Sequence, residues 1–293
     1  MKKEQMAGHG IALVCIVIWS SVIIFTKILL QTLKPADILF WRFLIGYLTL
    51  WIIYPHPLRL KNKRSECIFL ICGLTGVNLY FYLQNSALQN TRASDVSIII
   101  CIAPMFTAIL QQIVNKKKKC SLYFYFGFII AILGIICVCS SGAKGSSNIG
   151  GIIMTLCAGI AWAIYSVSGE LLANDKYPVI LCIRRYFFYG LLTMIPMLLL
   201  HGMTSVSVVL RPEIMGSLCY MGIGASAMAY VLWNISTKKI GIVQTNLYLY
   251  LIPIMTIIIS AIVLEEQITR NVILGTVLTI VGLILSEKRR SNE

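Results

Sequence analysis

The apolar stretch GHGIALVCIVIWSSVIIFTK, residues 8–27, decides the fold class. It contains no Asp, Glu or Arg, and its one Lys is its last residue, Lys27. About 20 apolar residues in a row are enough for one helix to cross a bilayer. The stretch is too long for the apolar core of a signal peptide, and no small-residue cleavage site follows it before the next apolar run. We therefore expect it to remain in place as a membrane-spanning helix.

The whole chain shares the composition of this stretch. Of its 293 residues, 58% are hydrophobic and 12% are charged, whereas about a quarter of the residues in a soluble domain are charged. So few charges cannot cover a water-facing surface, and the sequence predicts an all-α polytopic membrane protein. Run length and flanking residues place ten transmembrane helices, at residues 8–31, 36–54, 67–88, 93–114, 121–140, 150–172, 178–200, 213–235, 242–264 and 270–286.

The net charge of +14 raises the question of a nucleic-acid partner. Such binding needs the basic residues gathered on one folded face, but here they lie in short clusters between apolar runs. Cytoplasmic loops carry an excess of Lys and Arg, which explains the clusters if both termini are cytoplasmic. We expect a multi-pass protein of the cell membrane, with the lipid bilayer and no nucleic acid as partner. The residues expected inside are Lys2, Lys3, Arg59, Lys61, Lys63, Arg64, Lys116 to Lys119, Lys176, Lys238, Lys239, Lys288, Arg289 and Arg290; those expected outside are Lys34, Arg92, Lys144, Arg211 and Arg270.

The two halves of the chain are copies of each other. Residues 151–170, GIIMTLCAGIAWAIYSVSGE, repeat residues 8–27 at an offset of 143, and further matches follow at offsets of 149 and 148. We predict one five-helix repeat in residues 1–143, a second in residues 148–287 and a basic cytoplasmic tail in residues 288–293. Because five is odd, the repeats are inverted, as is typical of secondary transporters. The matched pairs are Trp19 with Trp162, Lys27 with Glu170, Pro35 with Pro178, Arg42 with Arg185, Asn85 with Asn234, Pro104 with Pro253, Thr107 with Thr256, Gly127 with Gly275 and Gly134 with Gly282.

These residues resemble a known family pattern. The first half carries Gly10, Trp19-Ser20, Lys27, Pro35, Arg42, Ala93-Ser94 and Pro104-Met105-Phe106; the second carries Trp162, Pro178, Arg185, Pro253, Glu266, Thr269, Gly275 and Gly282. The chain thus resembles two EamA repeats of the drug/metabolite transporter superfamily. The resemblance implies a ten-helix carrier that exports or exchanges small metabolites, often amino acids and their derivatives. One departure is that the family's glutamate at the end of the fourth helix of a repeat is present as Glu266 but replaced by Lys117 in the first half.

Two prolines mark the expected substrate site. Pro104 and Pro253 fall near the middles of their predicted helices, where a proline removes a backbone hydrogen bond. Interrupted helices at matched positions in inverted repeats point to the binding site of a transporter. We therefore expect both to line a cavity at the membrane midplane. The alternative is a simple kink that serves packing.

Polar and aromatic side chains are expected around that cavity. Asn78, Tyr82 and Asn85 are spaced to share one face of a helix. Amide, hydroxyl and aromatic groups suit a small, partly apolar or zwitterionic substrate. The alternatives are an aromatic belt at the membrane surface and hydrogen bonds between helices. The candidate substrate-binding residues are Trp19, Asn78, Tyr82, Asn85, Pro104, Trp162, Tyr230, Asn234, Asn246 and Pro253.

Charges within the helices are candidate gating residues. Lys27, Arg42, Glu170 and Arg185 fall inside predicted spans, where ionisable groups are functional candidates. We hypothesise that Glu170 pairs with Arg185 or Arg184 as part of an inner gate. Alternatively, all of these side chains only reach out to the membrane surface.

The sequence offers little support for an enzyme. The three histidines, His9, His56 and His201, show no metal-ligand spacing and no nucleophile motif. We expect no cofactor and no metal, and no nucleotide motif is visible. Transport would then use a coupled proton or an exchange substrate. A channel-like facilitator and a non-transporting receptor or enzyme remain the alternatives.

Overall fold

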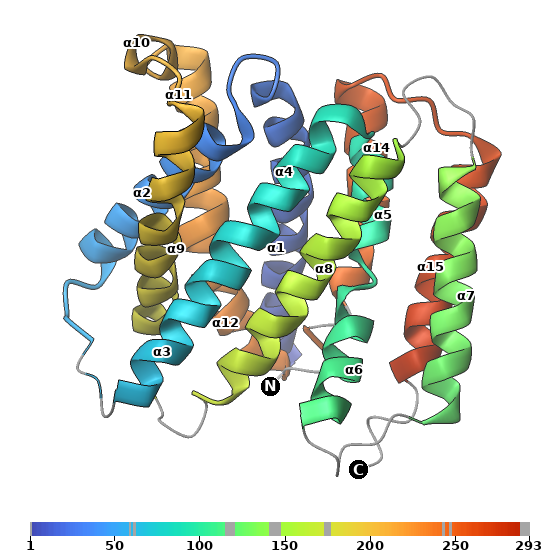
Figure 1. Ribbon diagram of the computed structural model, residues 1–293. Helices are drawn as coiled ribbons and strands as arrows, with labels where there is room; N and C mark the ends of the chain where they lie inside the picture. The colour runs from blue at the N-terminus through green and yellow to red at the C-terminus, as the bar shows by residue number, and fades with distance from the viewer. Residues whose placement is uncertain are drawn as a thin grey trace.

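The computed structural model describes residues 2–58, 60, 63–114, 121–140, 148–172, 177–241, 244–245 and 248–287. Within these ranges the regular structure is helical throughout (Figure 1). The elements of the first half are α1 (Lys2–Leu29), α2 (Pro35–Ile53), α3 (Lys63–Cys72), the π-helix η1 (Gly73–Leu79), α4 (Tyr80–Asn90), α5 (Ala93–Ile100), α6 (Ala103–Val114) and α7 (Leu122–Cys139). Those of the second half are α8 (Ile149–Glu170), α9 (Val179–His201), α10 (Val206–Val209), α11 (Pro212–Cys219), the π-helix η3 (Tyr220–Met228), α12 (Ala229–Ile240), the 3-10 turn η4 (Tyr248–Tyr250), α14 (Leu251–Val263) and α15 (Arg270–Glu287).

The helices have the length and composition of membrane spans. Eight helical segments of the described chain are long and apolar enough to cross a bilayer, and two shorter apolar helices, Tyr248–Val263 and Arg270–Ser286, complete the set. Many large apolar side chains on their outer surfaces are exposed, as lipid-facing residues would be. The predicted all-α polytopic fold is confirmed.

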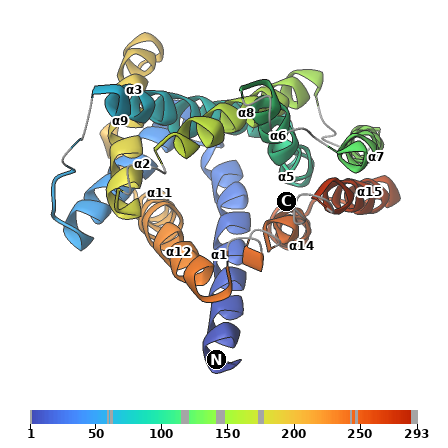
Figure 2. The same ribbon diagram turned by 90° about the horizontal axis from the view of Figure 1, so that it is seen from below.

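The two halves interlock through equivalent contacts. Helix α1 packs on α12, and its copy α8 packs on α4. In the same way α2 packs on η3 and α9 on η1. Helices α2 and α9 contact each other (Figures 1 and 2). These contacts are therefore equivalent in the two halves, as expected for two inverted five-helix repeats.

The fifth helices of the two halves, α7 and α15, pair at the periphery (Figure 2). Their glycines face each other reciprocally: a methyl group on Gly275 would lie 2.5 Å from the Gly134 carbonyl oxygen, and one on Gly282 would lie 2.5 Å from that of Gly127. Small residues let membrane helices approach closely where no hydrophobic effect drives them together. The glycines matched in the sequence thus form one symmetric contact.

Both prolines begin half-helices rather than kinking continuous ones. A turn at Cys101 and Ile102 separates α5 from α6, and Pro104 stands in the first turn of α6. Pro253 stands in the first turn of α14, directly after η4. The missing N–H costs nothing in a first turn, because no intrahelical acceptor exists there. The interruption expected at Pro104 thus appears between α5 and α6, and Pro253 follows the 3-10 turn η4.

Two π-helical segments interrupt the third and eighth spans at matched positions. The N–H of Tyr80 bonds the carbonyl of Thr75 at the end of η1, and that of Ala229 bonds Gly224 at the end of η3. Gly73 and Gly222 fall at the same repeat position, at an offset of 149. Such π-turns are frequent at functional sites; Gly76 and Val77 of η1 line a small cavity in the bundle.

Candidate functional site

A large cavity opens between α8, α9 and α12. Its volume is about 520 Å³, and we call it the vestibule. It lies among the C-terminal half of α8 and the N-terminal halves of α9 and α12. This is the side of the molecule on which α1 begins (Figure 1). Its lining residues are Tyr165, Ser166, Gly169, Leu172, Tyr177, Val179, Cys182, Ile183, Tyr186, Tyr230 and Asn234.

The vestibule ends at a cluster of aromatic rings in the middle of the bundle. Tyr165, Ile183, Tyr186 and Tyr230 also line a second cavity of only about 10 Å³, which we call the central chamber. That volume holds about one water molecule. In this conformation the rings therefore close the centre of the protein against the vestibule. The other residues of the chamber wall are Phe43, Gly76, Val77, Phe81, Trp162 and Phe187.

The matched tryptophans occupy equivalent positions between the repeats. The ring of Trp162 lies 4.9 Å from that of Tyr80 and 5.1 Å from that of Tyr165. The ring of Trp19 lies 4.9 Å from that of Trp233, and its Nε1 donates to the Ala225 carbonyl at 3.2 Å. Of the two, Trp162 lines the chamber, whereas Trp19 ties α1 to η3.

The structure brings together some of the predicted substrate-binding residues. Trp162, Tyr230 and Asn234 line the cavities, and Tyr230 belongs to both. The Nδ2 of Asn234 donates to the Tyr230 carbonyl at 2.8 Å. The sequence analysis did not single out Tyr165 and Tyr186, although Tyr165 follows Trp162 by three residues and so shares its helix face.

Other predicted residues lie outside the cavities. Asn78 donates to Thr193 Oγ1 at 3.2 Å and Asn85 to the Pro35 carbonyl at 3.4 Å, so both form the hydrogen bonds between helices that were the alternative. Tyr82 packs against the apolar core around α2, α3 and α9. Neither Pro104, at the surface, nor Pro253, buried, lines a cavity. Asn246, the run Lys116 to Lys119 and the tail 288–293 lie outside the described residues.

The two arginines that were predicted to pair with Glu170 contact other groups in this conformation. Because α9 packs on α3, Arg185 forms its ion pair with Glu66, and Tyr189 donates to the same carboxylate. Arg184 donates to the carbonyls of Tyr54 and His56. Its guanidinium lies 3.8 Å from the Trp51 ring centroid. Both arginines thus bind partners from the first repeat.

The opposite side of the bundle is closed around the turn between α4 and α5. Lys27 Nζ donates to the carbonyls of Leu88 at 2.5 Å and Thr91 at 2.7 Å, at the end of α4. Glu266, from the connection between α14 and α15, accepts from the N–H groups of Ala93 at 2.7 Å and Ser94 at 3.2 Å, at the start of α5. A cation at a helix C-terminus and an anion at an N-terminus both satisfy orphan backbone groups and the helix dipole.

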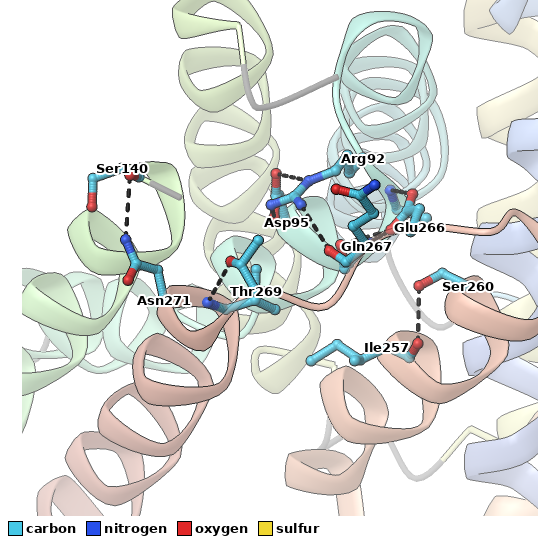
Figure 3. A network of polar contacts seen from close by, with 12 residues as sticks. Arg92, Asp95, Ser140, Ile257, Ser260, Glu266, Gln267, Thr269 and Asn271 are labelled. Atoms are coloured by element: carbon cyan, nitrogen blue, oxygen red, sulfur yellow. Dashed lines mark hydrogen bonds and ion pairs between the residues drawn. The ribbon is translucent and has the colours of Figure 1, made fainter. Parts of the chain in front are cut away.

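An ion pair strengthens the same turn. Arg92 binds both carboxylate oxygens of Asp95, at 2.9 and 2.7 Å, and donates to the Gln267 carbonyl at 3.3 Å (Figure 3). Glu265, with φ of 54°, turns the chain after α14 so that Glu266 reaches α5. We call Lys27, Arg92, Asp95 and Glu266 the outer cluster. It links α1, the α4–α5 turn and the α14–α15 connection.

The protein is a helical membrane bundle of two interlocked inverted repeats. It is hollow on one side, and charged side chains hold it closed on the other. This is the architecture typical of a secondary transporter. The chain belongs to the EamA-like transporter family, whose profile matches residues 6–140 and 149–287. The expected family resemblance is thereby confirmed.

Individual relatives agree with this assignment. An uncharacterized transporter of Archaeoglobus fulgidus is 28% identical over 96% of this chain and 98% of its own length. A protein of Streptantibioticus cattleyicolor named a probable terminal-alkyne amino-acid exporter is 22% identical over 94% of this chain and 91% of its own. One crystal structure, 16% identical, superposes with a TM-score of 0.67 over 99% of this chain and 98% of that chain. This last likeness shows the shared fold.

Proposed function

We propose that this protein is a secondary transporter that moves a small metabolite across the cell membrane by alternating access around the central chamber. The observation that carries the proposal is the asymmetry of the bundle. The 520 Å³ vestibule leads to the chamber from one side, while the outer cluster ties the helices together on the other. A carrier caught open to one side has this form.

The vestibule side is proposed to be cytoplasmic. Lys238 and Lys239 stand in the last turn of α12, and Lys63 and Arg64 begin α3 on the same side. Positive charge concentrates on the cytoplasmic ends of membrane helices. Both termini would then be cytoplasmic and the state inward-open.

The opposite state would require the outer cluster to separate and the vestibule to close. The interrupted helices α5/α6 and η4/α14, together with η1 and η3, supply matched places where a helix can bend. The two repeats would therefore rock as units around the chamber.

The proposed substrate is an amino acid or an amino-acid derivative, exported or exchanged. The chamber offers aromatic rings, and Asn234 and Tyr230 offer polar groups beside them. The name of the Streptantibioticus relative is consistent with this substrate class. The energy source is proposed to be a coupled proton or an exchange substrate.

Counterflow in proteoliposomes tests the proposal. The purified protein is reconstituted, loaded with an unlabelled amino-acid mixture and given a panel of labelled amino acids and their derivatives outside. We expect saturable uptake that a loaded substrate accelerates. Uptake that stays linear with concentration and ignores the loaded substrate would instead show a channel-like facilitator. Binding without vectorial flux would show a receptor or an enzyme.

A further inference from the structure

Arg42 is a deeply buried cation that the protein satisfies incompletely. It stands on α2 and is 4% exposed. Its Nε donates to Ser226 Oγ at 2.7 Å. Within the described part of the chain, its two terminal nitrogens Nη1 and Nη2 have neither a hydrogen-bond acceptor nor a carboxylate partner.

The other arginines near the helices are engaged by the protein itself. Arg92 binds Asp95, Arg185 binds Glu66, and Arg184 binds two backbone carbonyls. A buried charge without a counter-charge is costly, above all in a membrane. Arg42 therefore stands out as a cation whose negative partner is absent from the described chain.

The surroundings of Arg42 lead to the central chamber. Its guanidinium carbon lies 4.6 Å from the Phe81 ring centroid and 5.1 Å from that of Phe43. Both rings line the chamber, as does Tyr230, which is also an electrostatic neighbour of Arg42. Among the described residues, the walls of the chamber and vestibule contain no Asp or Glu. Arg42 itself belongs to neither wall and lies against the Phe43 and Phe81 rings, so an anion that displaced these rings would meet a positive charge.

We propose that Arg42 binds the carboxylate of the transported substrate, while the apolar part of the substrate packs on Phe43, Phe81 and Trp162. This inference rests on the proposed transport function and specifies its substrate as a small organic carboxylate. A guanidinium presents two parallel N–H groups to a carboxylate, and Ser226 fixes its orientation through Nε. Because no acidic side chain lines the site, the amino group of an amino acid is dispensable for binding.

The small volume of the chamber makes binding part of the conformational change. About 10 Å³ cannot hold a substrate, so the rings of Phe43, Phe81 and Tyr230 must separate for one to enter. The free energy gained when the carboxylate meets Arg42 would favour that separation.

Matched ligand series test the inference by binding. Phenylalanine, 3-phenylpropionate and phenethylamine share one apolar body and differ in their charged groups; leucine, 4-methylpentanoate and isoamylamine form a second series. Binding is followed by quenching of tryptophan fluorescence in detergent and by thermal shift. We expect at least one acid and its amino acid to bind and neither amine to bind. Arg42→Gln should weaken the binding of the acid at least about tenfold, and Arg42→Lys should weaken it less.

Control variants separate recognition from folding. Arg211→Gln removes an exposed arginine before α11 and should leave binding unchanged. Ser226→Ala keeps the charge of Arg42 but removes the hydrogen bond to its Nε, and we expect it to weaken acid binding about threefold. This variant replaces Arg42→Gln as the test if Arg42→Gln does not fold. Binding of the amines, failure of every acid to bind, or an acid affinity that Arg42→Gln and Ser226→Ala leave unchanged would overturn the inference. Acid binding that depends on Arg42 but gives no counterflow would keep the site and contradict the proposed transport.

Discussion

At the scale of single residues, the positions of charges decide which side of the bundle is closed. Lys27 and Glu266 bind opposite ends of the α4–α5 turn, one at the carbonyls of α4 and the other at the N–H groups of α5. The matched positions in the other repeat carry Glu170 and Lys117. The charges are thus exchanged, and the same capping chemistry cannot recur at the vestibule side. The contacts of the outer cluster can therefore form on only one side of the bundle.

Replacing Glu266 by Gln should weaken the closure of this side. The amide keeps the shape and one acceptor oxygen but loses the charge, which lowers the free energy of closure by about 1–2 kcal/mol. We expect wider distances between spin labels placed across the outer side, measured by pulsed EPR. Glu213→Gln, on the exposed first turn of α11, is the control. Equal distance distributions in the Glu266→Gln variant and the wild type would show that the cluster does not hold the gate.

Some side-chain partners could not be predicted from the sequence. Glu170 and Arg185 were expected to pair because both lie near one connection, but α9 turns Arg185 toward Glu66 of α3. That partner is 119 residues away in the chain. Asn78 and Asn85 were expected to face the cavity, but Asn78 donates to Thr193 of α9 and Asn85 to Pro35 of α2. A polar face on a membrane helix indicates that the face does not contact lipid. It does not indicate whether the face contacts a cavity or another helix.

At the scale of elements, close packing of the π-segments positions the chamber. A methyl group on Gly222 of η3 would lie 2.7 Å from the Ile45 side chain and 2.9 Å from the Arg42 carbonyl oxygen. Gly73 of η1 makes the equivalent approach to α9, with a methyl position 2.8 Å from the Gly190 nitrogen. The run of apolar residues predicted the helices but not their π-turns. A π-turn adds one residue to a helical turn and does not change the apolar character of the run.

Gly222→Ala should therefore destabilise the protein, whereas Gly224→Ala should not. The added methyl would push α2 away from η3, with a loss of about 1–3 kcal/mol in stability. A methyl on Gly224, two residues along η3, meets nothing closer than 3.7 Å, at the Tyr220 ring. We expect a lower melting temperature for Gly222→Ala and an unchanged one for Gly224→Ala. If both variants melt alike, tight packing at η3 does not matter for stability.

At the scale of the whole molecule, the repeat visible in the sequence specifies most of the architecture. Matched Trp, Pro, Arg and Gly residues at nearly constant offsets predicted two inverted five-helix units, and the interlocked contacts α1–α12 and α8–α4 agree with them. Symmetry, however, cannot predict a difference between the halves. The vestibule on one side and the outer cluster on the other depend on side-chain contacts across the repeats, which no local pattern encodes.

The central claim is that the vestibule and the outer side open in turn. It is tested with single cysteines in a background in which the ten native cysteines are replaced. Ser166→Cys reports on the vestibule, and Thr91→Cys, buried beside the outer cluster, reports on the other side. A membrane-impermeant thiol reagent is applied to inside-out and right-side-out vesicles, with and without Glu266→Gln.

We predict reciprocal labelling. Ser166→Cys should react from the cytoplasmic face and Thr91→Cys from neither face, until Glu266→Gln raises labelling of Thr91→Cys from outside and lowers that of Ser166→Cys from inside. If Glu266→Gln raises labelling at both positions together, the account of alternating access around this chamber is contradicted. If Ser166→Cys reacts only from outside, the proposed cytoplasmic orientation of the vestibule is contradicted.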